Sequence, residues 1–219
     1  MSNEIPDFQA YKKQQQAEAD DALLSLQIQF SKWTDLHINL REKVRAKHLF
    51  EDWTGCPTAF LEEGPWNTYF LDWMKYDYKS VAGSRLFDQF IKAEAASLYS
   101  VQRQLAALIM VSALEPFKIE TCEESVIKGR FFLDNASTST VHLFSYGKEK
   151  PRSGSIVLVR AITYRGKTYS IHTPAPAYLN ETEADYFWSE EKSGRSSAEF
   201  KRLFAKDHGI IWYRHVLGH

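Results

Sequence analysis

Cysteine is scarce in this chain and long apolar runs are absent. Both features narrow the classes of protein to which the chain can belong. Only Cys56 and Cys122 carry thiols among 219 residues, which excludes a disulfide framework and the clustered thiolates of a structural zinc or iron–sulfur site. No stretch approaches the ~18 uninterrupted apolar residues of a membrane span, and residues 1–16 lack the apolar centre of a signal peptide. We therefore expect a cytoplasmic protein with reduced thiols.

An excess of charge of one sign is missing as well. The chain has 27 Lys and Arg residues against 28 Asp and Glu residues, and its formal net charge is −1. No field of the whole molecule therefore draws it to nucleic acid or to a membrane, and any such attraction must be local. Because 44% of the residues are hydrophobic and 14% aromatic, we expect a packed core rather than disorder.

The common catalytic and nucleotide-binding motifs do not occur. There is no G-x-S-x-G elbow, no G-x-x-x-x-G-K-[ST] loop, no G-x-G-x-x-G turn and no H-E-x-x-H helix, so these motifs indicate neither a hydrolase nor a nucleotide site. His208, His215 and His219 could share a helical face, but chance spacing is the favoured interpretation. Neither cysteine has a base beside it in sequence. We expect no cofactor and no bound metal.

The first half of the chain has the periodicity of helices. Residues 7–54 contain no proline or glycine, and apolar residues fall on one helical stripe at Leu26, Phe30, Trp33, Leu40 and Val44. This predicts one or two helices with the stripe in the core. The alternation of apolar and polar residues over 24–30 leaves a short strand as an alternative. After a loop over 55–65, three more helices are expected before Pro116.

From Phe117 onward the pattern changes to short β-branched and aromatic runs. Five strands are predicted, with the sequences FKIET, VIKGRFFL, TVHLFSY, SIVLVRAITY and KTYSIH. The last two are joined by Arg165-Gly166, which predicts a tight hairpin because glycine accepts a positive φ. A flat sheet of this size buries little, so we expect a partly open barrel. Pro174 and Pro176 end the strands.

Together these patterns predict an α+β fold in three segments. Residues 1–115 form a helical domain, residues 116–180 a five-stranded, barrel-like antiparallel β-domain, and residues 181–219 a helical segment. Within the last segment two helices are expected on either side of Ser193-Gly194, with Thr182 as a possible cap for the first.

One aromatic stretch resembles a bacterial family. The run Phe70-Leu-Asp-Trp-Met-Lys-Tyr-Asp-Tyr78, followed by a helical pair that leads into Phe117-Lys-Ile, is similar to the SEC-C-associated uncharacterised proteins, and the resemblance covers roughly Trp66 to His172. It implies an aromatic helix ahead of a small β-domain and no established activity. The cysteine-rich zinc tail that often ends such proteins is absent here, so the resemblance implies no zinc-tail role.

Charge differs between the two halves. Residues 116–180 carry nine basic and five acidic residues, a balance of +4, whereas residues 1–65 carry seven basic and eleven acidic residues, a balance of −4. Small barrels with cationic grooves and aromatic platforms bind single-stranded nucleic acid. The candidate contacts to a partner or nucleic acid are Lys128, Arg130, Arg160, Arg165 and Lys167. Alternatively, the acidic N-terminal part pairs with the basic strands inside the molecule or in a dimer.

We expect a binding or adaptor role rather than catalysis. The partner would be a protein or, second, RNA in a ribosomal setting, and charge reversal at Arg165 and Lys167 should weaken binding without unfolding.

Asp72 and Asp77 diverge by roughly 140° on an unbroken helix, so a catalytic pair is disfavoured. The rival hypothesis is an enzyme with a site between helices and sheet, built from groups such as Asp77, Arg130, His142 and His172. A structural module of a phage or mobile element stays open.

Overall fold

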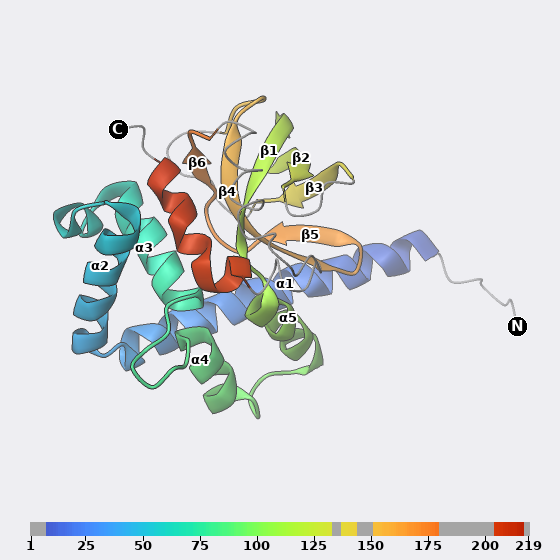
Figure 1. Ribbon diagram of the computed structural model, residues 1–219. Helices are drawn as coiled ribbons and strands as arrows, with labels where there is room; N and C mark the ends of the chain where they lie inside the picture. The colour runs from blue at the N-terminus through green and yellow to red at the C-terminus, as the bar shows by residue number, and fades with distance from the viewer. Residues whose placement is uncertain (1–7, 133–136, 144–150, 180–203, 217–219) are drawn as a thin grey trace, which may run out of the picture.

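Helices occupy the first half of the chain in the computed structural model, which describes residues 8–132, 137–143, 151–179 and 204–216 (Figure 1). The helical elements are α1 (Phe8–His37), α2 (Leu40–Thr54), the short 3-10 helix η1 (Thr58–Leu61), α3 (Gly64–Tyr76), α4 (Leu86–Glu94) and α5 (Ser100–Val111). The predicted helical N-terminal half is confirmed. Within the described ranges, no helix is long and apolar enough to cross a membrane.

Helix α1 passes unbroken through residues 24–30, so the alternative of a strand there is wrong. Leu26 and Phe30 are buried, while Leu24 and Ile28 point outward with 49% and 47% of their surface exposed. The apparent alternation is therefore one apolar helix face with two exposed aliphatic residues beside it. α1 is the longest helix of the described residues, and in Figure 1 it runs between the barrel on one side and α4 and α5 on the other.

The predicted apolar stripe packs into the core only within α1. A break at Ile38-Asn39 ends the helix, and the Asn39 side chain accepts a hydrogen bond of 2.8 Å from the Arg41 amide to cap α2. Because α2 restarts in a new direction, Leu40 and Val44 lose their place in the stripe and lie 74% and 48% exposed. The prediction that both belong to the core is wrong.

The second half of the chain contains a small barrel. Its strands are β1 (Leu114–Glu123), β2 (Val126–Phe131), β3 (Ser139–His142), β4 (Ile156–Tyr164) and β5 (Lys167–Ser170), and β6 (Ala175–Ala177) extends the sheet beside β4. The five predicted strands are all present, and the α+β class is confirmed. β6 is an additional strand in the region where Pro174 and Pro176 were expected to end the sheet; Pro176 is exposed at its edge.

The strands follow the order β1-β2-β3-β5-β4, and β4 pairs back with β1. Four of these pairings are antiparallel, and the fifth, between β3 and β5, is parallel. The barrel is therefore mixed rather than wholly antiparallel, and it closes where a partly open one was expected. Closure pairs the edges that a flat sheet would leave open.

Two glycines fix the shape of the barrel. A Cβ on Gly129 would lie 1.9 Å from the backbone oxygen of Lys118, so only glycine lets β2 approach β1 beside the irregularity between Ile119 and Thr121. At the β4–β5 turn, Arg165 and Gly166 take φ values of 50° and 76°. The predicted two-residue hairpin is confirmed, and Tyr164 pairs with Lys167 across it.

The hydrophobic clusters connect all three predicted segments. One cluster joins α1, α4 and α5 with Ile162, Tyr169 and Ile171 of the barrel region. Another joins α2 and α3 with Leu158 and with Trp212 of η2 (Gly209–His215). Residues 204–208 are helical and precede η2, and this C-terminal part lies between α2–α3 and the barrel in Figure 1. The helices predicted around Thr182 and Ser193-Gly194 fall outside the described residues.

Candidate functional site

A group of charged side chains is buried where α3, β4 and residues 204–208 meet. Arg160 lies in the middle of β4 and is 1% exposed, and Asp77 follows the last residue of α3 and is 9% exposed. The Arg160 guanidinium donates to the Asp77 carboxylate and, through its other terminal nitrogen, to the Ser112 carbonyl at 2.7 Å. The pair thus connects the barrel to the helices at a site without solvent.

Lys206 adds a second cation to this group. Its Nζ lies 3.4 Å from the other carboxylate oxygen of Asp77, and only 5% of the residue is exposed. The guanidinium of Arg160 also lies over the ring of Tyr76, 5.4 Å from its centroid. Asp77 is therefore bracketed by a cation from the barrel and one from the C-terminal helical turn.

Asp72 and His172 lie at the edge of the same group. The Asp72 carboxylate is 3.8 Å from the Nδ1 atom of His172, and their side chains are 18% and 2% exposed. His172 Nδ1 also lies 2.8 Å from the Thr173 carbonyl, which makes Nδ1 the protonated nitrogen of a neutral ring. We name the five residues Asp72, Asp77, Arg160, His172 and Lys206 the buried charge cluster.

Burial dominates the proton equilibria of the cluster. It raises the pKa of Asp72 to about 7, against the opposing attraction of Lys75 and Arg160. It lowers the pKa of His172 to about 3, and the nearby Arg160 acts in the same direction. Burial and Arg160 also lower the pKa of Lys206 to about 7, although Asp77 partly offsets this. When both acids are ionised, two carboxylates balance two cations around a neutral imidazole.

Sequence reasoning found part of this cluster. Asp77 and His172 were in the enzyme hypothesis, and the structure brings them to the same cluster, whereas Arg130 and His142 lie on β2 and β3. The predicted divergence of Asp72 and Asp77 requires an unbroken helix, but α3 ends at Tyr76. Lys206 was missed because nothing near it in sequence indicates burial. The apolar residues around Arg160 in the run SIVLVRAITY were the available indication that this arginine is enclosed.

Arg160, Arg165 and Lys167, which were predicted to bind a partner, contact groups inside the molecule. Arg160 is buried, so its assignment as a surface contact is wrong. Arg165 donates to the Glu18 carboxylate of α1 at 2.7 Å and to the Gln15 carbonyl at 2.9 Å. Lys167 donates to both oxygens of Asp20 at 2.8 and 2.9 Å. The alternative of internal pairing between the acidic N-terminal part and the basic strands is confirmed for these two residues.

Lys128 and Arg130 lie together on the outer face of β2. Lys128 is exposed and pairs in register with the exposed Thr140 of β3, and Arg130 pairs with Lys118 of β1. The Arg130 guanidinium lies 6.0 Å from the centroid of the Phe132 ring. The cross-strand register therefore sets cationic and hydroxyl side chains side by side on neighbouring strands.

The histidines do not assemble a metal site in the described part of the chain. The enzyme hypothesis placed His142 and His172 in one site, but His142 lies beside Tyr169, with ring centroids 6.5 Å apart, and His172 is in the buried charge cluster. His208 stacks on Phe204 at 4.5 Å, and His219 is outside the described residues. No group of three or more potential ligands occurs among the residues described.

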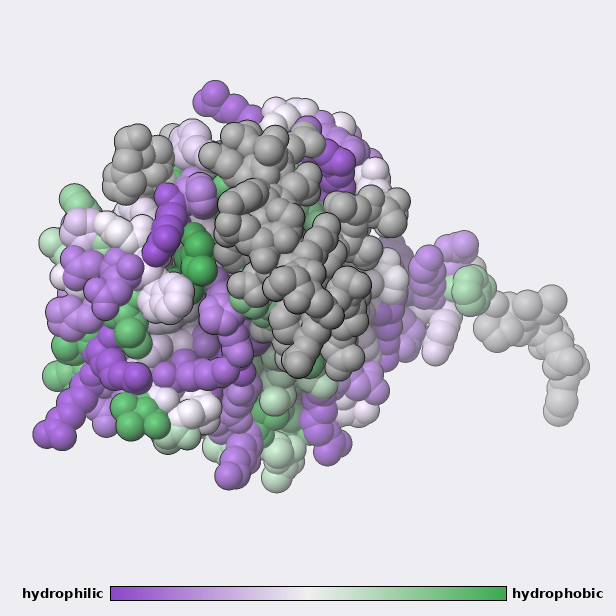
Figure 2. All heavy atoms as spheres, viewed as in Figure 1, coloured by the Kyte–Doolittle hydropathy of each residue, from purple (hydrophilic) through white to green (hydrophobic). Residues whose placement is uncertain are grey.

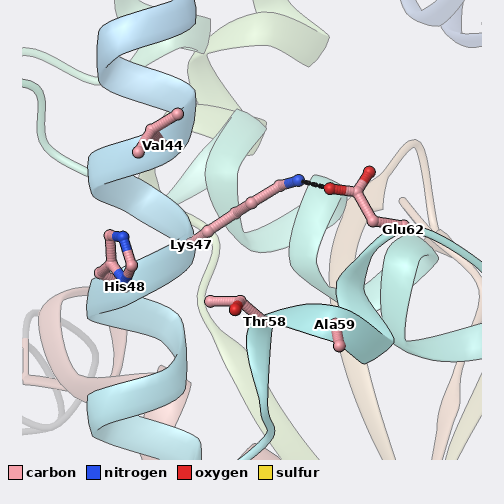
Figure 3. Close-up of a pocket in the computed structure, with 6 residues that line it drawn as sticks. All are labelled: Val44, Lys47, His48, Thr58, Ala59 and Glu62. Carbon is pink, nitrogen blue, oxygen red and sulfur yellow. Dashed lines mark hydrogen bonds and ion pairs between the residues drawn. The ribbon is translucent and has the colours of Figure 1, made fainter.

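A separate hollow opens on the surface between α2 and η1. It measures about 270 Å³ and is lined by Val44, Lys47, His48, Thr58, Ala59 and Glu62. Figure 3 shows Val44, Lys47 and His48 projecting from α2, with Lys47 reaching across to an ion pair with Glu62. No sequence motif marks this pocket, because its walls come from an ordinary helix and a short loop.

Comparison with known proteins adds no relative to this description: no family model, no curated protein and no solved structure matches the chain.

Proposed function

We propose that this chain is a non-enzymatic binding protein of the adaptor type, and that its barrel contacts single-stranded nucleic acid along the outer face of β2 and β3. The observation that carries the proposal is a set of two cross-strand pairs on one face, Lys118 with Arg130 and Lys128 with Thr140. The two pairs are two residues apart along β2, and neighbouring strands are about 4.8 Å apart, so an extended backbone that crosses this face would pass over both pairs. The phosphate groups of the nucleic acid would contact the cationic side chains, and the Thr140 hydroxyl would donate a hydrogen bond to a phosphate oxygen.

The strand order supports the same proposal. Five-stranded Greek-key barrels of the oligonucleotide- and oligosaccharide-binding type use the face of strands 2 and 3 and the loops after strands 1 and 4. The order β1-β2-β3-β5-β4 with its closure between β1 and β4 arranges the strands in a similar way. Here the loop after β4 carries Arg165, which is paired with α1. The proposed contact is therefore confined to the β2–β3 face.

The resemblance to SEC-C-associated proteins belongs to this proposal. The residues that carry it have internal roles here: Phe70 and Trp73 are buried, Asp77 pairs with Arg160, and the Tyr78 hydroxyl bonds Glu42 and Arg45. The similarity would thus report a shared way of joining helices to a barrel, with binding residues that differ from one protein to another.

Fluorescence anisotropy with labelled oligouridine and oligothymidine tests the proposal on the full chain. We expect binding that weakens with salt, with log K falling by roughly 0.7 per phosphate contact for each unit of log salt concentration. Lys128→Glu and Arg130→Glu should each weaken binding at least several-fold. Lys92→Glu, a matched reversal at an exposed position on α4, should leave it unchanged. Absence of binding at low salt, or equal loss in all three variants, would overturn the proposal.

An enzyme remains the second candidate because Asp72 and His172 are close neighbours with displaced pKa values. The Asp72 pKa of about 7 suits a general acid or base near neutral pH, with the neutral His172 ring 3.8 Å away. Such a site must be open to substrate. Carbodiimide coupling of an amine to native protein at pH 6, read by mass spectrometry with Asp72→Asn as the blank, tests access. An unlabelled Asp72 in the folded chain would exclude this candidate.

A further inference from the structure

The outward face of α2 combines cations with aliphatic side chains. Arg41, Val44, Arg45 and His48 are all exposed. Arg41 and His48 each lie three or four positions from both Val44 and Arg45, so the four residues share one side of the helix. Leu40, one turn before Val44 on the same helix, and Phe60 of η1 are 74% and 61% exposed. We name these six residues the α2 patch. Hydrophobic and hydrophilic surfaces are interspersed over the α2 region in Figure 2.

The patch itself contains basic residues and no acidic one, although the whole chain is nearly neutral. Arg41 and Arg45 are its cations, and the acidic residues beside it are Glu42, which lies 3.8 Å from Arg45, and Glu51, which lies 3.9 Å from His48. Arg45 is shared between Glu42 and the Tyr78 hydroxyl, and Lys47 pairs with Glu62. Arg41 makes no ion pair through its guanidinium with any residue that the structure describes. The guanidinium of Arg41 can therefore bind a carboxylate of a partner without competition from an acidic residue that the structure describes.

The pocket beside the patch fits one large side chain. Its volume of about 270 Å³ is just below the range of about 300–1,000 Å³ that holds whole small-molecule ligands. Val44, Ala59 and the Thr58 methyl group supply apolar lining, and Lys47 and His48 stand at its side (Figure 3). A leucine, phenylalanine or tryptophan could enter it while acidic neighbours met the surrounding cations.

We infer that the α2 patch docks an acidic segment of a protein partner, with one large apolar side chain of that segment held in the pocket between α2 and η1. Charge complementarity and exposed aliphatic area together favour this occupant. A nucleic-acid strand is held by several cations along its phosphates, whereas Arg45 and His48 of the patch lie beside Glu42 and Glu51. A membrane-surface helix segregates cations and apolar residues to opposite faces, but here Arg41 and Arg45 flank Val44 on one face.

This inference is independent of the barrel proposal, and together the two describe an adaptor with separate faces for a protein and a nucleic acid. The barrel face lies on β2 and β3, whereas the patch lies on α2 and η1, which share a hydrophobic cluster with α3. Loss of one contact should leave the other intact. Each proposal can therefore fail without the other.

A selection from a display library of random short peptides, with the full chain as bait, tests the inference. We expect enrichment of sequences that combine aspartate or glutamate with leucine, phenylalanine or tryptophan. Synthetic versions should bind the native chain, lose about tenfold in affinity when the apolar residue becomes alanine, and weaken with added salt.

Three variants decide where such peptides bind. Arg41→Glu should weaken binding by reversing the free cation, and Ala59→Trp should weaken it by filling the pocket. Lys12→Glu, an equal reversal at an exposed position on α1, should have no effect. Failure to enrich acidic-apolar sequences, or binding that both patch variants leave unchanged, would overturn the inference. Oligouridine or anionic-vesicle binding that is lost in Arg41→Glu would also overturn it, because the patch would then serve another class of partner.

Discussion

Arg160 of β4 and Asp77 after α3 form a buried ion pair between positions 83 residues apart in the chain. Both side chains are almost fully enclosed, at 2% and 6% exposure, so neither can recover water if the other is removed. Lys206 approaches the same carboxylate from residues 204–208. Two separate parts of the sequence, β4 and residues 204–208, thus depend on one carboxylate for the compensation of their charge.

Removal of that carboxylate charge should destabilise the protein strongly. Asp77→Asn leaves Arg160 and Lys206 buried without a counter-ion, and loss of one partner of a buried pair costs about 3–5 kcal/mol. We expect a decrease of this size in the free energy of unfolding, measured by urea denaturation followed by tryptophan fluorescence. Combining Asp77→Asn with Arg160→Met should cost less than the sum of the single changes. Additive losses would show that the pair is not coupled.

Acidification should have opposite effects through His172 and Asp72. The pKa of His172 falls from 6.5 unfolded to about 3 folded, so the unfolded state binds more protons in this window and stability falls as pH falls. The pKa of Asp72 rises from 3.8 to about 7, so the folded state binds more protons and stability rises as pH falls. Each contributes up to about 1.4 kcal/mol per pH unit. Between pH 4 and 6.5 the two should largely cancel.

Asp72→Asn should expose the hidden histidine contribution. Without the acid, the free energy of unfolding should decrease with falling pH from about 6.5, and urea melts at several pH values would measure the slope. Asp72→Asn combined with His172→Asn should restore a nearly flat profile. The same pH dependence in the native chain and in Asp72→Asn would contradict the assignment of opposing groups.

Charge reversal at Arg165 should act on stability, contrary to the expectation from sequence. Its partner Glu18 is 46% exposed, so solvent screens the pair and its loss should cost only about 0.2–1 kcal/mol. Arg165→Glu should lower the midpoint of urea unfolding slightly, and Glu18→Arg in the same chain should restore it. Reversal of both charges without recovery would mean that the hydrogen bond to the Gln15 carbonyl dominates.

Any side chain at position 129 should disrupt the barrel. Because a Cβ there would lie 1.9 Å from the Lys118 oxygen, Gly129→Ala should separate β1 from β2 and destabilise by about 1–3 kcal/mol or more. Thr140→Ala on the exposed face of β3 serves as the matched control and should change stability by less than about 0.5 kcal/mol. Thermal unfolding monitored by circular dichroism distinguishes the two. Equal stability of both variants would show that the strands can move apart freely.

The sequence predicted the element types well because they depend on local patterns. Period-3.6 apolar spacing found α3 and α5, and the β-branched runs found β1 to β5. The Arg165-Gly166 turn was also found, since its backbone requirement is confined to two residues. The exposure of Leu40 and Val44 was not, because the short break at Ile38-Asn39 changes the helix direction without a proline or glycine to mark it.

The site was less predictable because its members are distant in sequence. The apolar residues around Arg160 indicate that it is enclosed, but the groups that it contacts inside the molecule, Asp77 and the Ser112 carbonyl, are known only from the assembled fold. Similarly, Lys167 forms an ion pair with Asp20, which lies 147 positions earlier in the chain. The opposite net charges of the two segments correctly indicated that the N-terminal part and the strands attract each other. They did not show which residues form the ion pairs.

The late position of Lys206 bears on the order in which the protein is assembled during synthesis. The helices and the barrel strands leave the ribosome before residues 204–216 do, yet Trp212, Tyr213 and Val216 are fully part of their shared core. Until those residues arrive, Asp77 and Arg160 face an unfilled gap and the apolar surfaces of α2 and α3 stay open to solvent. A nascent chain is therefore expected to pass through an incompletely closed state, in which chaperone contact or proteolysis would be most effective.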